Sequence, residues 1–222
     1  MTELLTRLIG QTLSNQQLVL LVTAIYQLID PGRAAQLNVA DTLVTASAAA
    51  VGVSDPVVPS APLAYPLAAT TAMVKRTFVD RLKARGGGPV IPIDVPAMTN
   101  GARRHIQQAG RDRVLQSVNA DDRVQGWARM GTGLENCPFC DMLISRGPVY
   151  RSLETASFSS HDNCDCIAVP VFDRKDWAGK AHADALYSEW QEVTKGYSGT
   201  DALNAWRRHR SNPQTTATSV AA

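Results

Sequence analysis

The chain has 222 residues, 45% of them hydrophobic, and a formal net charge of +2. This length suits one or two domains, and this apolar content supports a real hydrophobic core, which excludes a chain that is disordered throughout. The small net charge gives no general electrostatic argument for nucleic-acid binding. No secretory leader pattern opens the sequence, and we expect no apolar run long enough to cross a bilayer. Folding in the cytoplasm is therefore predicted.

Helical periodicity dominates the first part of the chain. Residues 3–29 carry apolar side chains at three- and four-residue steps, and residues 34–51 repeat the pattern with many alanines. Between them stand Asp30, Pro31 and Gly32. Proline removes a backbone donor and glycine is a poor helix former, so we expect this tripeptide to separate two helices.

Proline then becomes frequent. Residues 52–70 hold four prolines together with glycine and serine, a composition typical of a linker or an extended arm. Residues 71–85 return to helical spacing, and a glycine run before Pro89 is expected to end that helix. A further, polar helix is predicted to start near Thr99 or Asn100, either of which can serve as its N-cap.

Short strands are predicted on both sides of a short helix. Residues 123–130 alternate between small or apolar and polar side chains, which is typical of a strand. Residues 139–146 have the spacing of a helix, and residues 149–150 and 167–172 are rich in strand-forming side chains. We expect these elements to form a small α/β module.

All four cysteines lie in this module, as the pairs Cys137 and Cys140, and Cys164 and Cys166. His161 stands three residues before Cys164. Each pair delivers two donors from a short stretch of chain, and the five side chains together exceed the four ligands of a tetrahedral structural zinc. We therefore predict a structural zinc site with these five residues as candidate ligands.

Other interpretations of the cysteines remain open. Disulfides between the pairs would close the same loop without a metal, although a cytoplasmic compartment disfavours them, and the thiols can also be vestigial. Cys137 at a helix start would have a lowered pKa and can act as a redox thiol, but the βαβ pattern of a thioredoxin-like scaffold does not precede it. We expect His105, His182 and His209 to be surface histidines, and we expect no catalytic residues and no cofactor other than zinc.

Aromatic side chains mark the end of the chain. Residues 173–210 contain three of the four tryptophans. Packing against the cysteine module is the preferred interpretation, and a docking element for a partner is the alternative. The basic end at 207–210 is expected to be a solvated helix terminus, with contact to DNA as the alternative. Residues 211–222 are polar and small, which predicts a flexible tail.

These patterns predict a mainly helical α+β protein, with a helical N-terminal half and a small cysteine-centred α/β module. The predicted regions, in chain order, are an N-terminal helical segment (1–51), a Pro-rich linker or arm (52–70), a helical region (71–122), the Cys/His module (123–172), a C-terminal helical segment (173–210) and the flexible tail (211–222).

The order of the motifs resembles that of a known family. Trp-Ala-Arg stands at 127–129, Cys-Pro-Phe-Cys at 137–140, Arg-Gly-Pro-Val-Tyr at 146–150 and His-Asp-Asn-Cys-Asp-Cys at 161–166. In this order the chain resembles the minor head proteins of tailed phages, in the Mu F-like group and especially its actinobacteriophage branch of minor capsid and head morphogenesis proteins. The resemblance covers about residues 100–172, and the combined order is far more specific than any one piece.

The resemblance implies a virion protein that is made in the host cytoplasm and sits inside the capsid near the portal. It implies a role in head assembly and in genome packaging or delivery. The implied partners are the portal protein, the major capsid or scaffold protein and phage DNA, with no membrane involved. Two alternatives remain: a thiol redox enzyme that uses Cys137 and Cys140, and a zinc-stabilised module that binds nucleic acid.

Overall fold

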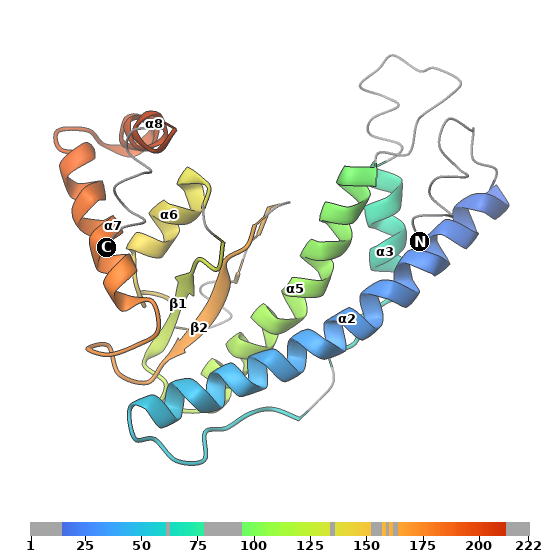
Figure 1. The fold of residues 1–222 in the computed structure, drawn as a ribbon, viewed down its shortest axis with the longest axis horizontal. Coiled ribbons are helices and arrows are strands. Elements are labelled where there is room, and N and C mark those ends of the chain that lie inside the picture. The colour runs from blue at the N-terminus through green and yellow to red at the C-terminus, as the bar shows by residue number, and fades with distance from the viewer. Residues whose placement is uncertain are drawn as a thin grey trace. The chain divides into compact units, whose positions relative to one another are not determined.

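The computed structural model of the chain describes residues 15–60, 63–77, 95–133, 136–151, 157–158, 160–161 and 164–211. The described helices and strands are, in chain order, α2 (Asn15–Ala50), α3 (Leu67–Lys75), α5 (Val95–Ala120), β1 (Gly126–Met130), α6 (Pro138–Ser145), β2 (Ile167–Val171), α7 (Lys180–Val193) and α8 (Gly199–Arg210) (Figure 1). The predicted mainly helical α+β class is confirmed. The glycine run at 86–88 and the tail beyond Ser211 lie outside the described residues.

The chain divides into two compact units. The first comprises Met1–Asn38, Ala61–Ala109 and His161–Asn163, and the second comprises Val39–Ser60, Gly110–Ser160 and Cys164–Ala222. Each unit has its own cluster of buried hydrophobic side chains. Each is also assembled from separate stretches of chain, whereas the sequence suggested consecutive regions.

Helix α2 continues through Pro31 without a break, so the predicted separation of two helices at this point is wrong. The side chains on either side of the proline explain why the helix continues, since Ile29 is fully buried and Arg33 is 8% exposed. Gly32 has a packing role, because a Cβ atom there would lie 2.9 Å from Cδ1 of Ile106. Tertiary packing therefore outweighs the local preference of Pro31 and Gly32 to end a helix.

The start of α5 also differs from the prediction. Thr99 and Asn100 were expected at the N-cap, but both lie inside the helix, which begins at Val95. Pro96 occupies the first turn, where its missing backbone N–H is tolerated and its fixed φ favours helix. A proline in the first turn was the signal that the prediction overlooked.

In the first unit, α3 lies against the N-terminal half of α2 and the start of α5 (Figure 1). A polar cluster joins these elements: the Tyr65 hydroxyl lies 2.8 Å from Nδ1 of His105, and the Arg33 guanidinium is 4.6 Å from the centre of the Tyr65 ring. Arg33 also donates to the His105 carbonyl at 2.8 Å. Burial raises the pKa of Tyr65. His105, which was expected at the surface, is half-buried in this cluster.

By length and composition, α2 has one stretch, Gln16–Ala50, that is apolar enough to cross a bilayer, which the sequence analysis did not expect. Core helices of water-soluble proteins pass the same test. Leu21, Ile25 and Ile29 of this helix are buried in the core of the first unit. Length and apolarity alone therefore do not assign α2 to a membrane.

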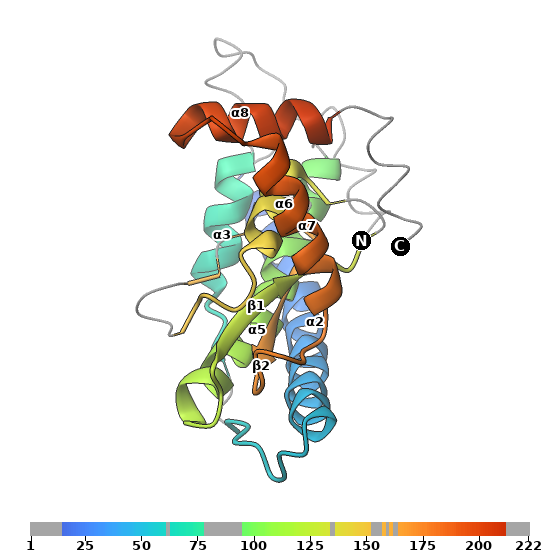
Figure 2. The same cartoon turned by 90° about the vertical axis from the view of Figure 1, so that its left-hand side faces the viewer.

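The second unit is built around an antiparallel pair of strands. The register of β1 and β2 runs from Gly126 opposite Val171 to Met130 opposite Ile167. Gly126 has a φ of 145°, and a Cβ atom there would lie 2.5 Å from the Tyr150 carbonyl oxygen, so only glycine fits this position. Helices α6 and α7 lie beside the strands, and α8 crosses the end of α7 (Figure 2).

Residues 52–60 of the predicted Pro-rich segment are not helical and belong to the second unit, whereas the prediction is wrong for residues 67–70, which form the first turn of α3. The Asp121 carboxylate accepts from the Val57 N–H at 2.9 Å, and Arg123 donates to the carbonyls of Ser54 and Asp55. Hydrogen bonds from Arg123, together with that from Val57, hold the pKa of Asp121 well below its usual range. These residues form an extended arm that is anchored by named contacts.

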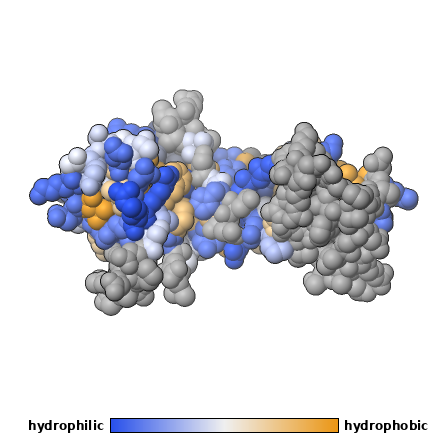
Figure 3. Space-filling model, turned by 90° about the horizontal axis from the view of Figure 1, so that it is seen from above, coloured by the Kyte–Doolittle hydropathy of each residue, from blue (hydrophilic) through white to orange (hydrophobic). Residues whose placement is uncertain are grey.

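The C-terminal aromatic side chains fill the core of the second unit. Trp177, Leu186 and Trp206 are buried in the same cluster as the second cysteine pair, which confirms the preferred interpretation of this segment. Tyr187 and Tyr197 are exposed. On the face shown in Figure 3, hydrophobic surface forms small patches among hydrophilic ones over the described residues.

Candidate metal centre

Three buried thiols meet in the second unit. The Sγ atoms of Cys140, Cys164 and Cys166 all lie within 4.8 Å of one another, and those of Cys140 and Cys164 are 3.7 Å apart. In a tetrahedral site with Zn–S bonds of about 2.3 Å, two sulfur atoms lie about 3.8 Å apart. A disulfide bond is about 2.05 Å long, and all four cysteines are free thiols in this structure. The spacing therefore suits sulfurs that share a cation.

Cys137 adds a fourth thiol at the start of α6. It is the N-cap residue, Pro138 follows it in the first turn, and its sulfur accepts the backbone N–H of Cys140 at 3.3 Å. Its Sγ atom lies within 4.8 Å of Cys140 Sγ. The helix N-terminus favours negative charge, so the local fold places the sulfur of the N-cap residue Cys137 where negative charge is stabilised.

Arg111, on α5, holds the second cysteine pair by its backbone. Its Nε atom donates to the Cys166 carbonyl at 3.0 Å, and one terminal nitrogen donates to the carbonyls of Cys164 and Cys166, at 2.8 Å each. The residue is 2% exposed, and burial lowers the pKa of Arg111 while the neighbouring thiols oppose that shift. In the sequence, Arg111 resembles a charge on the solvated face of a polar helix, but the structure buries it.

Helix α8 holds the first cysteine pair from another direction. The indole N–H of Trp206 donates to the Pro138 carbonyl at 2.7 Å, and Arg210 Nε donates to the Asp141 carboxylate at 2.8 Å. Asp141 is fully buried; burial raises the pKa of Asp141, and Arg210 opposes the shift. Pro138 and Asp141, which stand on either side of Cys140, are thus fixed by partners far along the chain.

The basic end of α8 takes part in this arrangement. Glu189 pairs with Arg210 at 3.3 Å and with Nε2 of His209 at 2.7 Å. The Arg210 side chain is only 8% exposed. The prediction of a solvated helix terminus is therefore wrong for His209 and Arg210, because these side chains bind carboxylates on α6 and α7. Arg207 and Arg208 are exposed, as expected.

The three clustered thiols share their protons. Hydrogen bonds with Cys140 and Cys166 lower the pKa of Cys164, whereas the bonds with Cys164 and Cys166, together with burial, raise the pKa of Cys140. For Cys166, the bond with Cys140 lowers the pKa, but the bond with Cys164 and burial outweigh it. A thiolate at Cys164 accepting hydrogen bonds from two thiols is the arrangement expected from these shifts. A thiophilic cation would replace those protons.

A second buried arginine lies in the same core. Arg129, on β1, is 4% exposed, and its guanidinium carbon lies 3.8 Å from the centre of the Phe158 ring. The guanidinium carbon of Arg111 lies 4.8 Å from the same ring centre. Trp127 stacks on Tyr150, with the ring centres 4.4 Å apart, and contributes to the same core. Arg129 belongs to the Trp-Ala-Arg motif at 127–129, but no role was predicted for it from the sequence.

His161 is exposed and belongs to the first unit, so its predicted role as a ligand stays a prediction. The structure thus brings together three of the five predicted donors, Cys140, Cys164 and Cys166, with Cys137 next to Cys140. A zinc site, a pair of disulfides and a redox couple each require different partners for these sulfurs. Three buried sulfurs close together favour a site that binds a cation.

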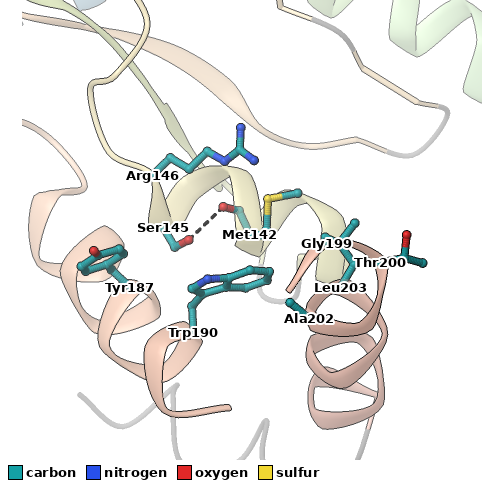
Figure 4. Close-up of a pocket in the computed structure, with 9 residues that line it drawn as sticks. All are labelled: Met142, Ser145, Arg146, Tyr187, Trp190, Gly199, Thr200, Ala202 and Leu203. Atoms are coloured by element: carbon teal, nitrogen blue, oxygen red, sulfur yellow. Dashed lines mark hydrogen bonds between the residues drawn. The ribbon is translucent and has the colours of Figure 1, made fainter. Parts of the chain in front are cut away.

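A pocket of about 520 Å³ opens between α6, α7 and α8 (Figure 4). Its lining residues are Met142, Ser145, Arg146, Tyr187, Trp190, Gly199, Thr200, Ala202 and Leu203. The Trp190 ring lies across its floor, and the Ser145 hydroxyl donates to the Met142 carbonyl at 2.8 Å. Arg146 is the one charged side chain among these lining residues, so they supply no acid–base pair.

The fold and the site define a mainly helical protein in which buried cysteines that could hold a metal ion lie within the larger hydrophobic core. The model of the VG15 protein family matches residues 4–193, and the chain belongs to this family. The Gene 15 protein of Mycobacterium phage D29 is 30% identical, over 54% of this chain and 56% of its own length. The Gene 15 protein of Mycobacterium phage L5 is also 30% identical, over 54% of this chain and 59% of its own length.

The chain therefore spans less than two thirds of the curated relatives that it matches. No solved structure matches it. The expectation of a phage protein is confirmed by the family and by the two mycobacteriophage relatives.

Proposed function

We propose that this protein is a minor structural protein of a tailed-phage head. It sits inside the capsid near the portal and contributes to head assembly and to genome packaging or delivery. The observation that carries the proposal is the match to a phage family over residues 4–193, a range that includes the whole cysteine cluster. The motif order in the same range resembles that of Mu F-like minor head proteins, which supports the proposal. The portal protein, the major capsid or scaffold protein and phage DNA are its partners.

Zinc has a structural role in this proposal. Cys140, Cys164 and Cys166 belong to the main hydrophobic cluster of the second unit, so a cation held there would join α6 to the segment that enters β2. Structural zinc sites contribute directly to folding, because the unfolded chain lacks a preformed site. Thiolate ligands select zinc over magnesium or calcium.

The proposed role is not catalytic. A dithiol redox couple at Cys137 and Cys140 needs a sulfur that substrate thiols can reach. Cys140 is 3% exposed and lies 3.7 Å from Cys164, an environment that suits a structural ligand better than an attacking or resolving thiol.

The test uses a phage that carries this gene. We expect mass spectrometry of purified particles to find the protein at low copy number in DNA-filled and in emptied heads. A deletion should yield heads that lack DNA or particles that fail to deliver it, and Cys140→Ser should lose incorporation. Tyr197→Ala, at an exposed site on the same unit, is the control and should incorporate normally. Absence of the protein from particles, with normal infection by the deletion phage, would sink the proposal.

A further inference from the structure

Four thiols of the second unit come from two short stretches of chain. Cys140 links the two cysteine pairs, because its sulfur lies within 4.8 Å of Cys137 Sγ and within 4.8 Å of the sulfurs of Cys164 and Cys166. Cys137 is fixed at the helix start by the hydrogen bond from the Cys140 N–H. Cys137 would supply the fourth sulfur beside the trio, and four thiolates are a closed donor set for a structural zinc.

Charge gives a second, independent argument. A divalent cation bound by four thiolates has a net charge of two negative units, and burial of uncompensated charge is costly. Arg111 and Arg129 place two positive charges in the same core, with 2% and 4% exposure.

The positions of the two guanidinium groups strengthen this argument. Both lie over the ring of Phe158, at 4.8 Å for Arg111 and 3.8 Å for Arg129. Two like charges close together in a buried site repel each other, so nearby negative charge stabilises both guanidinium groups. A metal–tetrathiolate centre supplies that negative charge, and the face of the aromatic ring adds a weaker attraction.

We infer that all four cysteines bind one thiophilic divalent cation as a tetrathiolate, and that Arg111 and Arg129 are positioning residues that balance its charge. This inference rests on the structural metal centre of the proposed function. Arg111 has a further task that Arg129 lacks, because its planar fork fixes the carbonyls of Cys164 and Cys166.

The first test measures zinc affinity on the full, reduced chain by competition with a chromophoric chelator. Arg111→Met and Arg129→Met should each weaken zinc binding by about 10- to 100-fold, the usual effect of losing a partner of a metal ligand. Arg111→Lys keeps the charge and loses the fork, so its affinity should lie between those of the wild type and Arg111→Met. Arg123→Met is the matched control: Arg123 also donates to two carbonyls, but its charge faces Asp121.

The second test identifies the donors with Co²⁺, whose thiolate charge-transfer absorption reports the number of bound sulfurs. Cys137→Ser should lower that absorption, and His161→Asn should leave it unchanged. If the wild type binds neither Zn²⁺ nor Co²⁺, the metal centre itself fails, while the head-protein proposal still rests on the particle experiment. If the wild type binds metal and Cys137→Ser leaves the absorption unchanged, the tetrathiolate is wrong. Equal zinc affinities for Arg129→Met and Arg123→Met would overturn the charge-balance role, and equal affinities for Arg111→Lys and Arg111→Met would mean that Arg111 acts only through its fork.

Discussion

The two compact units of this chain build their cores from different kinds of side chain. The first packs three helices through residues such as Leu21, Ile25 and Val74, and a polar cluster around Tyr65 joins them. The second has a two-stranded sheet and short helices, and thiols occupy the positions where hydrophobic side chains would otherwise meet. The contrast teaches that hydrophobic contacts stabilise both units, whereas the second also depends on specific contacts around its thiols.

This difference also determines how each unit responds to damage. Loss of one methyl group in a helical core costs about 1 kcal/mol, because the neighbours partly fill the space. Loss of one ligand from a metal site removes binding energy that is also folding energy. Damage to the second unit should therefore have the larger consequences.

The largest effect is expected for Cys140→Ser, since Cys140 contacts sulfurs of both pairs. We expect loss of bound zinc and a fall of more than about 4 kcal/mol in the free energy of unfolding of the second unit, the range reached when a metal is lost. Hydrogen exchange followed by mass spectrometry should show faster exchange in α6 and β2, and unchanged exchange in α3. Ser145→Ala, on the same helix, is the control. An equal loss of protection in α3 would break the comparison between the units.

A smaller effect is expected for Trp206, which joins α8 to the first cysteine pair. Trp206→Ala should cost about 3–5 kcal/mol, the usual range for removing a buried tryptophan. Trp206→Phe keeps most of the buried ring and loses the bond to the Pro138 carbonyl, so it should cost about 1 kcal/mol. Urea unfolding of the metal-loaded chain measures both. Equal costs for the two variants would mean that the hydrogen bond, and not the packing of the ring, stabilises α8.

Local patterns in the sequence predicted much of the second unit. The helix expected at 139–146 is α6, Pro138–Ser145, and the strands expected at 123–130 and 167–172 contain β1 and β2. Alternation, proline and glycine positions and paired cysteines are short-range signals, and these elements are short. The buried C-terminal tryptophans followed from their size and apolarity in the same way.

Long-range pairings could not be predicted in this way. Arg111 meets the carbonyls of residues more than 50 positions away, and Arg210 meets Asp141 across a similar gap. On the sequence, both arginines resemble solvated helix charges, because the identity of the facing segment is not encoded in the helix itself. The prediction of a helix break at Pro31 was wrong for the same reason: the contacts that keep α2 continuous come from other parts of the chain.

The smallest predicted effect is the difference in stability between alanine substitutions at two glycines of the first unit, Gly32 and Gly101. It tests whether close packing between helices is what requires glycine in this unit. Inside a helix, alanine is more favourable than glycine by roughly 1 kcal/mol in folding free energy when there is space for its Cβ atom. At Gly32 a Cβ atom would lie 2.9 Å from Ile106 Cδ1, and at Gly101 it would lie 2.8 Å from Met73 Sδ. The β-branched isoleucine is stiff, whereas methionine adapts its three torsions.

We therefore expect Gly101→Ala to be neutral or stabilising by up to about 0.5 kcal/mol, and Gly32→Ala to destabilise by about 1 kcal/mol, the lower end of the cost of overpacking. Ile106→Ala removes Cδ1, Cγ1 and Cγ2, the three atoms nearest to the added Cβ, so Gly32→Ala should cost less in that background, which a double-mutant cycle by thermal unfolding measures. If the cost of Gly32→Ala is the same with alanine at position 106, the close approach of α2 and α5 is not what requires glycine here. The backbone preferences around Pro31 would then be the cause, and the helical unit would depend on local conformation more than on packing.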